Sequence, residues 1–280
     1  MKTRVISGIF IVIFTLGLVW LGDLYLAGAL LAISICAYFE LCHATKVSEP
    51  GKVNVLEVVT SIVIAGYYAL VYFVNNPLYS MLVIVLLLII HMFVYVLAYP
   101  KYHADQIMKS YFSFVYAPVM LSFITMTRQM SGKLDTDANI IGFYAVWMIF
   151  ISAWFSDTMA YFTGVCIGKH KAFPVLSPKK TIEGCVGGIC GGALGGYLYG
   201  LVLTKCGVMG NEIILPFVLL GFVGSIVGMI GDLAASAIKR NYEIKDYGKI
   251  IPGHGGFMDR FDSIIFTAPL VYILATFFIL

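Results

Sequence analysis

Charged and hydroxyl side chains recur at helical spacing in the segment 232–243, directly after a long apolar run. Residues three and four positions apart share one face of a helix, and this spacing predicts a polar stripe made of Asp232, Ser236, Lys239 or Arg240, and Glu243. Lysine and arginine at a helix end can extend to lipid headgroups without any other role. Asp232 is not explained in this way, because an ionised carboxylate beside apolar residues needs a partner. The stripe is therefore a candidate site for ionic chemistry.

A second group of polar residues surrounds a glycine-rich turn in the segment 245–262. These residues are Lys245, Asp246, His254, Asp259, Arg260 and Asp262. The glycines around His254 force turns, and Asp259 and Asp262 share a face if the next helix has begun by then. Two carboxylates beside lysine and arginine suit Mg²⁺ together with phosphate oxygens. A charge-balanced loop has the same composition, and the spacing alone leaves both interpretations open.

Two earlier segments carry the same residue types. Asp157 lies in apolar surroundings near the end of the run 139–164. The connection that follows contains Ser177-Pro-Lys179-Lys180-Thr181, whose hydroxyl and ammonium groups offer a place where anions can dock. Lysines in such a connection also fix the orientation of a membrane protein, and this effect accounts for some of them regardless of any substrate.

Lipid must be the solvent of most elements that position these residues. Hydrophobic residues make up 60% of the 280 positions and charged residues only 12%, whereas a soluble domain carries roughly 25% charged residues. A membrane helix needs about 20 mostly apolar residues. The sequence therefore predicts an all-α polytopic membrane protein with about nine transmembrane helices, at approximately 5–21, 24–42, 56–74, 78–99, 107–128, 139–164, 184–205, 212–238 and 263–280.

The distribution of lysine and arginine predicts the orientation of these helices. With a cytoplasmic N-terminus and nine alternating helices, fifteen of the 18 Lys and Arg residues fall on the cytoplasmic side and three on the other. Cytoplasmic loops carry such an excess, so the polar loops 165–183 and 239–262 are both expected there. The net charge of +3 is small, and no nucleic-acid partner is expected.

The chain is expected to divide into N-terminal transmembrane helices, 1–138 with about five spans, and a C-terminal catalytic transmembrane region, 139–280. The first helix after the loop 165–183 is rich in glycine at intervals of four residues. The two glycine rows are Gly184, Gly188, Gly192, Gly196 and Gly200, and Gly187, Gly191 and Gly195. Small residues at this spacing favour close helix packing in lipid. A phosphate-cradling loop is the alternative, but no strand or Walker-type lysine accompanies these glycines.

Taken together, these motifs resemble one family. The chain resembles the phosphatidate cytidylyltransferases, also called CDP-diacylglycerol synthases, over the run Ser236-Ala-Ile-Lys-Arg-Asn-Tyr-Glu-Ile-Lys-Asp-Tyr-Gly-Lys-Ile-Ile-Pro-Gly-His-Gly-Gly-Phe-Met-Asp-Arg-Phe-Asp262. The segments Asp157-Thr-Met-Ala-Tyr161 and Ser177-Pro-Lys-Lys-Thr-Ile-Glu-Gly184 are similar to the other polar motifs of that family. The N-terminal half agrees only in hydropathy and length.

The resemblance implies transfer of a cytidylyl group from CTP to phosphatidic acid, which yields CDP-diacylglycerol and pyrophosphate. It also implies a Mg²⁺ requirement and a homodimer in the lipid bilayer. The positions that match the metal-binding carboxylates are Asp232 and Asp259, with Asp157 as a further ligand or a partner of one. Phosphate groups would be held by Lys179, Lys180, Lys239, Arg240 and Arg260. The site would also be lined by Ser177, Thr181, Ser236, Lys245, Asp246 and His254.

Two other functions use similar residues. A CTP-dependent lipid-alcohol kinase shares the nucleotide and the membrane setting. An ion-coupled transporter also carries intramembrane carboxylates, but its binding site commonly lies near the membrane midplane between internal repeats. Here the polar residues gather in loops and helix ends, and the sequence contains no repeat. The compact chain favours a bacterial plasma membrane, with the active site on the cytoplasmic side.

Overall fold

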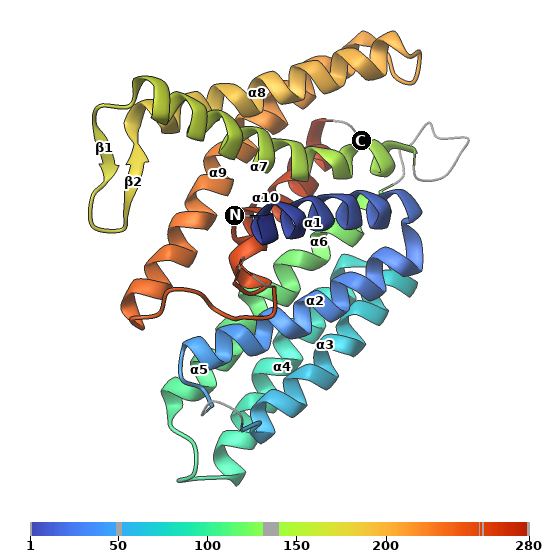
Figure 1. Ribbon diagram of the computed structural model, residues 1–280. Helices are drawn as coiled ribbons and strands as arrows, with labels where there is room; N and C mark the ends of the chain where they lie inside the picture. Colours follow the sequence, from blue (N-terminus) through green and yellow to red (C-terminus); the bar gives the residue numbers. More distant parts are fainter. Residues whose placement is uncertain (1, 49–51, 131–139, 252, 254, 279–280) are drawn as a thin grey trace. The chain divides into compact units, whose positions relative to one another are not determined.

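The computed structural model describes residues 2–48, 52–130, 140–251, 253 and 255–278 (Figure 1). Most of these residues are helical, which confirms the predicted all-α class. The helices are α1 (Lys2–Leu21), α2 (Asp23–Ala44), α3 (Val55–Phe73), α4 (Pro77–Leu97), α5 (Ala104–Phe114), η1 (Val115–Val119), α6 (Met120–Arg128), α7 (Ile140–Ile167), α8 (Ile182–Lys205), η2 (Asn211–Ile213), α9 (Ile214–Asn241) and α10 (Met258–Phe278). The strands are β1 (Lys171–Phe173) and β2 (Ser177–Thr181).

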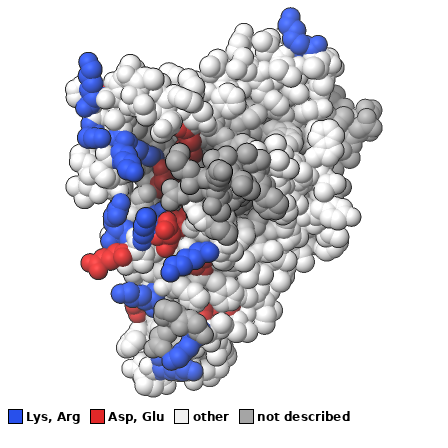
Figure 2. All heavy atoms as spheres, viewed as in Figure 1, with Lys and Arg blue, Asp and Glu red and all other residues white. Residues whose placement is uncertain are grey.

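The helices have the length and composition of membrane spans. Eight stretches within the described residues are long and apolar enough to cross a bilayer, and one of them joins α5, η1 and α6. The ninth predicted span, 5–21, is helical in α1, where Val12–Leu21 is an apolar stretch shorter than the other eight. Figure 2 shows that most of the visible surface is uncharged. A surface of this kind is stable when lipid rather than water covers it.

The chain forms two compact units, and the first consists of Met1–Met126 with Asn241–Phe261. Within it α2 packs against α3, α5 and η1, and α4 packs against α3 and α5 (Figure 1). Hydroxyl and imidazole groups between these helices satisfy one another, as buried polar groups must. The Ser110 hydroxyl lies 2.7 Å from the Tyr38 hydroxyl and 3.0 Å from His91 Nε2, and all three side chains are fully buried.

The second unit consists of Thr127–Arg240 and Asp262–Leu280. In it α7 runs alongside α8 over most of its length (Figure 1). The Ser225 hydroxyl of α9 donates to the Ser152 carbonyl of α7 at 3.3 Å, and the Thr267 hydroxyl of α10 donates to the Ile149 carbonyl of α7 at 3.4 Å. These hydrogen bonds link α7 to α9 and α10.

The glycines of α8 pack against neighbouring helices, as the spacing predicts. A methyl group added at Gly188 would contact Ser156 and Ala160 of α7 at 3.0 Å. One added at Gly196 would collide with the backbone of Phe217 in α9. Such close approach is possible only where no side chain intervenes. The glycine-rich helix therefore lies within contact distance of α7 on one face and α9 on another, and the packing interpretation is confirmed.

The structure departs from the expected loops in three places. The loop expected at 165–183 contains an antiparallel hairpin, in which Lys171 pairs with Thr181 and Phe173 with Ser177. The loop expected at 239–262 is shorter, because α9 continues to Asn241 and α10 begins at Met258. Glu243 lies beyond the end of α9 with φ 55°, so it is not part of the helical stripe. Hydropathy did not reveal these boundaries, because most of the residues that extend the two helices are polar.

Candidate functional site

The second unit contains a cavity of about 380 Å³ lined by α7, β2, α8 and α9. Its lining includes Ser156, Asp157, Ala160, Tyr161, Lys179, Lys180, Thr181, Gly184, Cys185 and Met229. The structure thus brings together Asp157 and the lysines of the Ser177–Thr181 segment, which lie more than twenty positions apart in the sequence. Apolar and cationic side chains share this cavity, so an anion with an attached apolar group fits its chemistry.

An ion pair joins the hairpin to α9 within this unit. Lys180 Nζ lies 2.6 Å from Asp232 Oδ2, and the two side chains keep 25% and 30% of their surface exposed. Lys180 is therefore the partner that the ionised Asp232 carboxylate was expected to need. Both groups remain accessible to a ligand, because neither is buried.

The base of the hairpin is held by the start of α8. The Thr181 hydroxyl accepts a hydrogen bond from the Gly184 N–H at 3.1 Å and caps α8. The Glu183 carboxylate accepts from the Lys169 N–H at 3.1 Å and lies 2.6 Å from His170 Nδ1. Thr181 therefore has a structural role in placing Lys179 and Lys180, in addition to any contact with a substrate.

A third carboxylate, Asp262, was paired with Asp259 in the sequence as a possible Mg²⁺ ligand but was not among the residues assigned to the metal. It lies within electrostatic range of Asp232, Asp157 and Lys239. Lys180 and Lys239 offset part of the negative charge of the three carboxylates. The signal for Asp262 was present in the sequence, where it follows Asp259 by three residues. Its proximity to Asp157 required the packing of α7, α9 and α10.

The described residues contain no group of three or more His, Cys, Asp or Glu side chains that could hold a metal ion. Mg²⁺ does not require such a group, since it is usually bound through one or two carboxylates together with water and substrate phosphates. Asp157 is exposed and Asp232 is partly exposed, and both supply hard oxygen donors. This donor chemistry fits Mg²⁺ bound together with a phosphate group.

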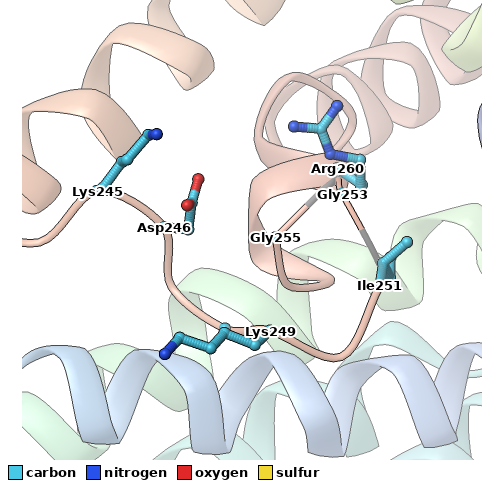
Figure 3. A pocket seen from close by; sticks show the side chains of 8 residues that line it. Lys245, Asp246, Lys249, Ile251, Gly253, Gly255 and Arg260 are labelled. Carbon is cyan, nitrogen blue, oxygen red and sulfur yellow. The ribbon is translucent and has the colours of Figure 1, made fainter. Parts of the chain in front are cut away.

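The first unit contains a separate cavity of about 510 Å³, formed by the segment between α9 and α10. Its lining residues are Lys245, Asp246, Gly248, Lys249, Ile251, Gly253, Gly255 and Arg260. Figure 3 shows the loop with Lys245, Asp246 and Lys249 running past the start of α10, which carries Arg260. Three cations and one anion give the cavity a positive balance. Such a cavity suits phosphate oxygens.

Asp259 is buried beneath this loop rather than exposed in the cavity. Its Oδ2 accepts hydrogen bonds from the Tyr247 N–H at 2.8 Å and the Gly256 N–H at 3.0 Å. Only 5% of Asp259 is exposed. The carboxylate therefore organises the loop at the start of α10, a role that the sequence did not predict. Its assignment as a metal ligand stays a prediction.

Glu40 is a residue that the sequence did not single out. It lies near the end of α2 and is 5% exposed. Its carboxylate accepts hydrogen bonds from the Phe257 N–H at 3.1 Å and the Met258 N–H at 2.8 Å. The available signal was a carboxylate at the end of an apolar span, where an ionised group needs a partner. The identity of that partner could not be inferred from the sequence.

Four further predicted residues lie on β2 and α9 of the second unit. Ser236 and Lys239 are half-buried on α9, and Arg240 is exposed at its end. Ser177 is half-buried at the start of β2, outside the cavity lining. His254 lies outside the described residues.

Comparisons with known proteins agree with the motifs. A sequence profile of the cytidylyltransferase family matches residues 2–278. Phosphatidate cytidylyltransferase of Bacillus subtilis (strain 168) is 31% identical over 284 residues, which cover 99% of this chain and 98% of that protein. The proteins of the same name from Staphylococcus haemolyticus and Thermotoga maritima are 43% and 40% identical over 48% and 45% of this chain and 49% and 47% of their own. Because the family profile spans nearly the whole sequence, this chain belongs to the cytidylyltransferase family.

Proposed function

We propose that this protein transfers a cytidylyl group from CTP to phosphatidic acid, forming CDP-diacylglycerol and pyrophosphate for phospholipid biosynthesis. The observation that carries the proposal is the similarity to a phosphatidate cytidylyltransferase over 99% of the chain. The cation-lined cavities and the accessible carboxylates support it, because both substrates are anions.

The reaction asks for alignment of two anions that repel each other. An oxygen of the phosphatidate phosphate attacks the α-phosphorus of CTP, and the bond from that phosphorus to the pyrophosphate oxygen breaks. The protein must hold both phosphate groups in line and offset the charge of the leaving group. Lys179 and Lys180 of β2, Lys239 and Arg240 of α9, and Arg260 of α10 are the proposed phosphate-binding residues.

We propose Mg²⁺ as the cofactor, with Asp232 and Asp259 as ligands and Asp157 as a further ligand or a partner of one. When bound, Mg²⁺ would offset the negative charge on phosphate oxygens. The support for Asp232 is its partial exposure beside Lys180, and the support for Asp259 is its place in the motif. Ser177, Thr181, Ser236, Lys245, Asp246 and His254 are proposed to line the substrate site.

We also propose a homodimer in a bacterial plasma membrane, with the reacting groups on the cytoplasmic side. The apolar helices support a bilayer setting, and the excess of lysine and arginine in the polar loops supports the orientation. A site at this interface would let the lipid stay in the bilayer while CTP arrives from the cytosol.

The proposal is tested with purified protein in detergent, mixed with phosphatidate, CTP and Mg²⁺. We expect mass spectrometry to detect CDP-diacylglycerol and pyrophosphate in equal amounts, and no product with EDTA in place of Mg²⁺. Diacylglycerol and polyprenol, offered in place of phosphatidate, should give nothing. Formation of CDP and a phosphorylated lipid alcohol would instead identify a kinase.

A further inference from the structure

The N-terminal helices contain none of the motif residues, yet one of them reaches the motif directly. Glu40 of α2 binds two consecutive backbone N–H groups, those of Phe257 and Met258, at 3.1 and 2.8 Å. Glu40 and Phe257 are 217 positions apart in the sequence. A contact of this range ties the start of α10 to a helix that the proposed chemistry does not otherwise use.

The start of α10 needs such a partner. The first N–H groups of a helix have no acceptor within the helix, and a Ser, Thr, Asp or Asn side chain usually supplies one. Phe257, which precedes α10, has no side-chain acceptor. A carboxylate from another helix can take the place of this missing acceptor. It accepts two hydrogen bonds at once, and its negative charge is stabilised at the positive end of the helix dipole.

The loop that lines the cavity also packs on the Glu40 carboxylate. A methyl group added at Gly248 or Gly256 would collide with the carboxylate oxygens. Gly248 lines the cavity with Lys245, Lys249 and Arg260. The Glu40 carboxylate therefore packs against the loop at two glycines and accepts two N–H groups at the start of α10.

Asp259 is a second buried carboxylate that binds this turn. Its Oδ2 accepts the Gly256 N–H at 3.0 Å and the Tyr247 N–H at 2.8 Å. The N–H groups of Gly256, Phe257 and Met258 are thus divided between two buried carboxylates. Displacement of Glu40 would loosen the turn that sets the position of Asp259 and Arg260.

We propose that Glu40 is a positioning residue, a clamp that holds the loop at Gly248 and Gly256 and the start of α10 at Phe257 and Met258, so that the phosphate-binding cations and Asp259 keep their working geometry. The expected change in kinetics rests on the proposed function. The expected change in the structure of the loop rests only on the observed contacts of Glu40. The group whose binding it supports is a phosphate, whether it comes from CTP or from phosphatidate.

The test is Glu40→Gln in the full-length protein. Glutamine keeps the size of the side chain, but its amide nitrogen is a donor and cannot accept an N–H group. We expect hydrogen exchange, followed by mass spectrometry, to speed up in peptides covering 245–258 and to stay unchanged in α8. We expect kcat/KM to fall by roughly tenfold or more, with a higher KM for the substrate whose phosphate this cavity binds. Separate titrations of CTP and phosphatidate identify that substrate.

Glu57→Gln is the matched control. Glu57 is also a buried carboxylate of the first unit, and it accepts the Asn54 N–H at 2.9 Å in the cap of α3. Its other partners are the Ser48 hydroxyl at 2.7 Å and His43 Nε2 at 3.9 Å, and these three partners are not among the residues that line the cavity. The Glu57→Gln variant should have lower thermal stability, with unchanged KM values and unchanged hydrogen exchange in peptides covering 245–258. If Glu40→Gln fails to fold, Gly248→Ala presses on the same carboxylate from the loop and should give the same exchange pattern.

Exchange is measured without substrate, so the clamp is tested whatever reaction the protein performs. Normal exchange and normal KM values in Glu40→Gln, with an active wild type, would overturn the clamp and leave the proposed function intact. Equal effects of Glu40→Gln and Glu57→Gln on exchange in 245–258 would reduce Glu40 to a general stabiliser of the fold. Faster exchange in a protein that forms no CDP-diacylglycerol would retain the clamp and refute the proposed function.

Discussion

Asp232 combines an accessible carboxylate with a lysine partner at 2.6 Å. We expect Asp232→Asn to lower turnover at least about a hundredfold, since an amide cannot replace an anionic metal ligand. Folded protein should persist in the membrane, because the side chain is only partly buried. The assay is CDP-diacylglycerol formation at saturating Mg²⁺.

Asp105→Asn is the control for loss of an ion pair. Asp105 Oδ2 lies 2.8 Å from Lys109 Nζ, and 55% of the Asp105 side chain is exposed. Such surface pairs contribute little to stability, so this variant should retain its activity. Near wild-type turnover of Asp232→Asn would show that the metal assignment is wrong.

Arg240 distinguishes phosphate binding from contact with lipid headgroups. An arginine that only extends to the headgroups tolerates Arg240→Lys, because charge and stem are kept. A guanidinium that binds two phosphate oxygens does not, because an ammonium acts as a point charge. We expect Arg240→Lys to lower kcat/KM about tenfold, equivalent to about 1.4 kcal/mol. Unchanged kinetics in both Arg240→Lys and Lys239→Arg would favour headgroup contact.

At the residue scale the sequence identified the motif residues but not all of their roles. Residue type and helical spacing singled out Asp232, and the structure supplied its partner Lys180. Asp259 was expected at a metal, while the structure shows its Oδ2 bound to two backbone N–H groups. The role of Glu40 was not predicted, because it depends on a contact with a residue 217 positions away in the sequence. No local pattern encodes such a contact.

The elements were largely predictable because lipid imposes long apolar helices. The hairpin of β1 and β2 was not predicted, because strands of three and five residues, the second of them mostly polar, give no periodic hydropathy signal. The early start of α10 was left open, because Asp259, Arg260 and Asp262 are polar enough to belong either to a loop or to a helix start.

The α8 glycines offer a test of helix packing. A methyl group at Gly196 would collide with the Phe217 carbonyl of α9, and backbone cannot move aside cheaply. We expect Gly196→Ala to destabilise the protein by about 1–3 kcal/mol through overpacking. The measurement is a lower apparent Tm in detergent.

Gly66→Ala is the control, because a methyl group at this position in α3 meets nothing within 4 Å. Alanine is also the better helix former, so this variant should match the wild type or slightly exceed it. Equal Tm values for the two variants would contradict the close packing of α8 on α9.

On the scale of the whole molecule, the charge asymmetry predicts on which side of the membrane the polar loops lie. Lys171 and Lys249 are exposed and lie outside the apolar helices. In a background without the six free cysteines, Lys171→Cys and Lys249→Cys should react with a membrane-impermeant maleimide only after the cytoplasmic side is opened. Labelling of either from the outside of intact cells would contradict the orientation.

Labelled CTP distinguishes transfer of a cytidylyl group from transfer of a phosphoryl group. CTP labelled with ³²P at the α-position and, separately, at the γ-position is incubated with the purified protein, phosphatidate and Mg²⁺. We predict that the α-label enters the organic-soluble lipid and that the γ-label appears in pyrophosphate, because the bond broken lies between the α-phosphorus and the pyrophosphate. Transfer of the γ-label to lipid, or no label in lipid from either nucleotide, would contradict the account.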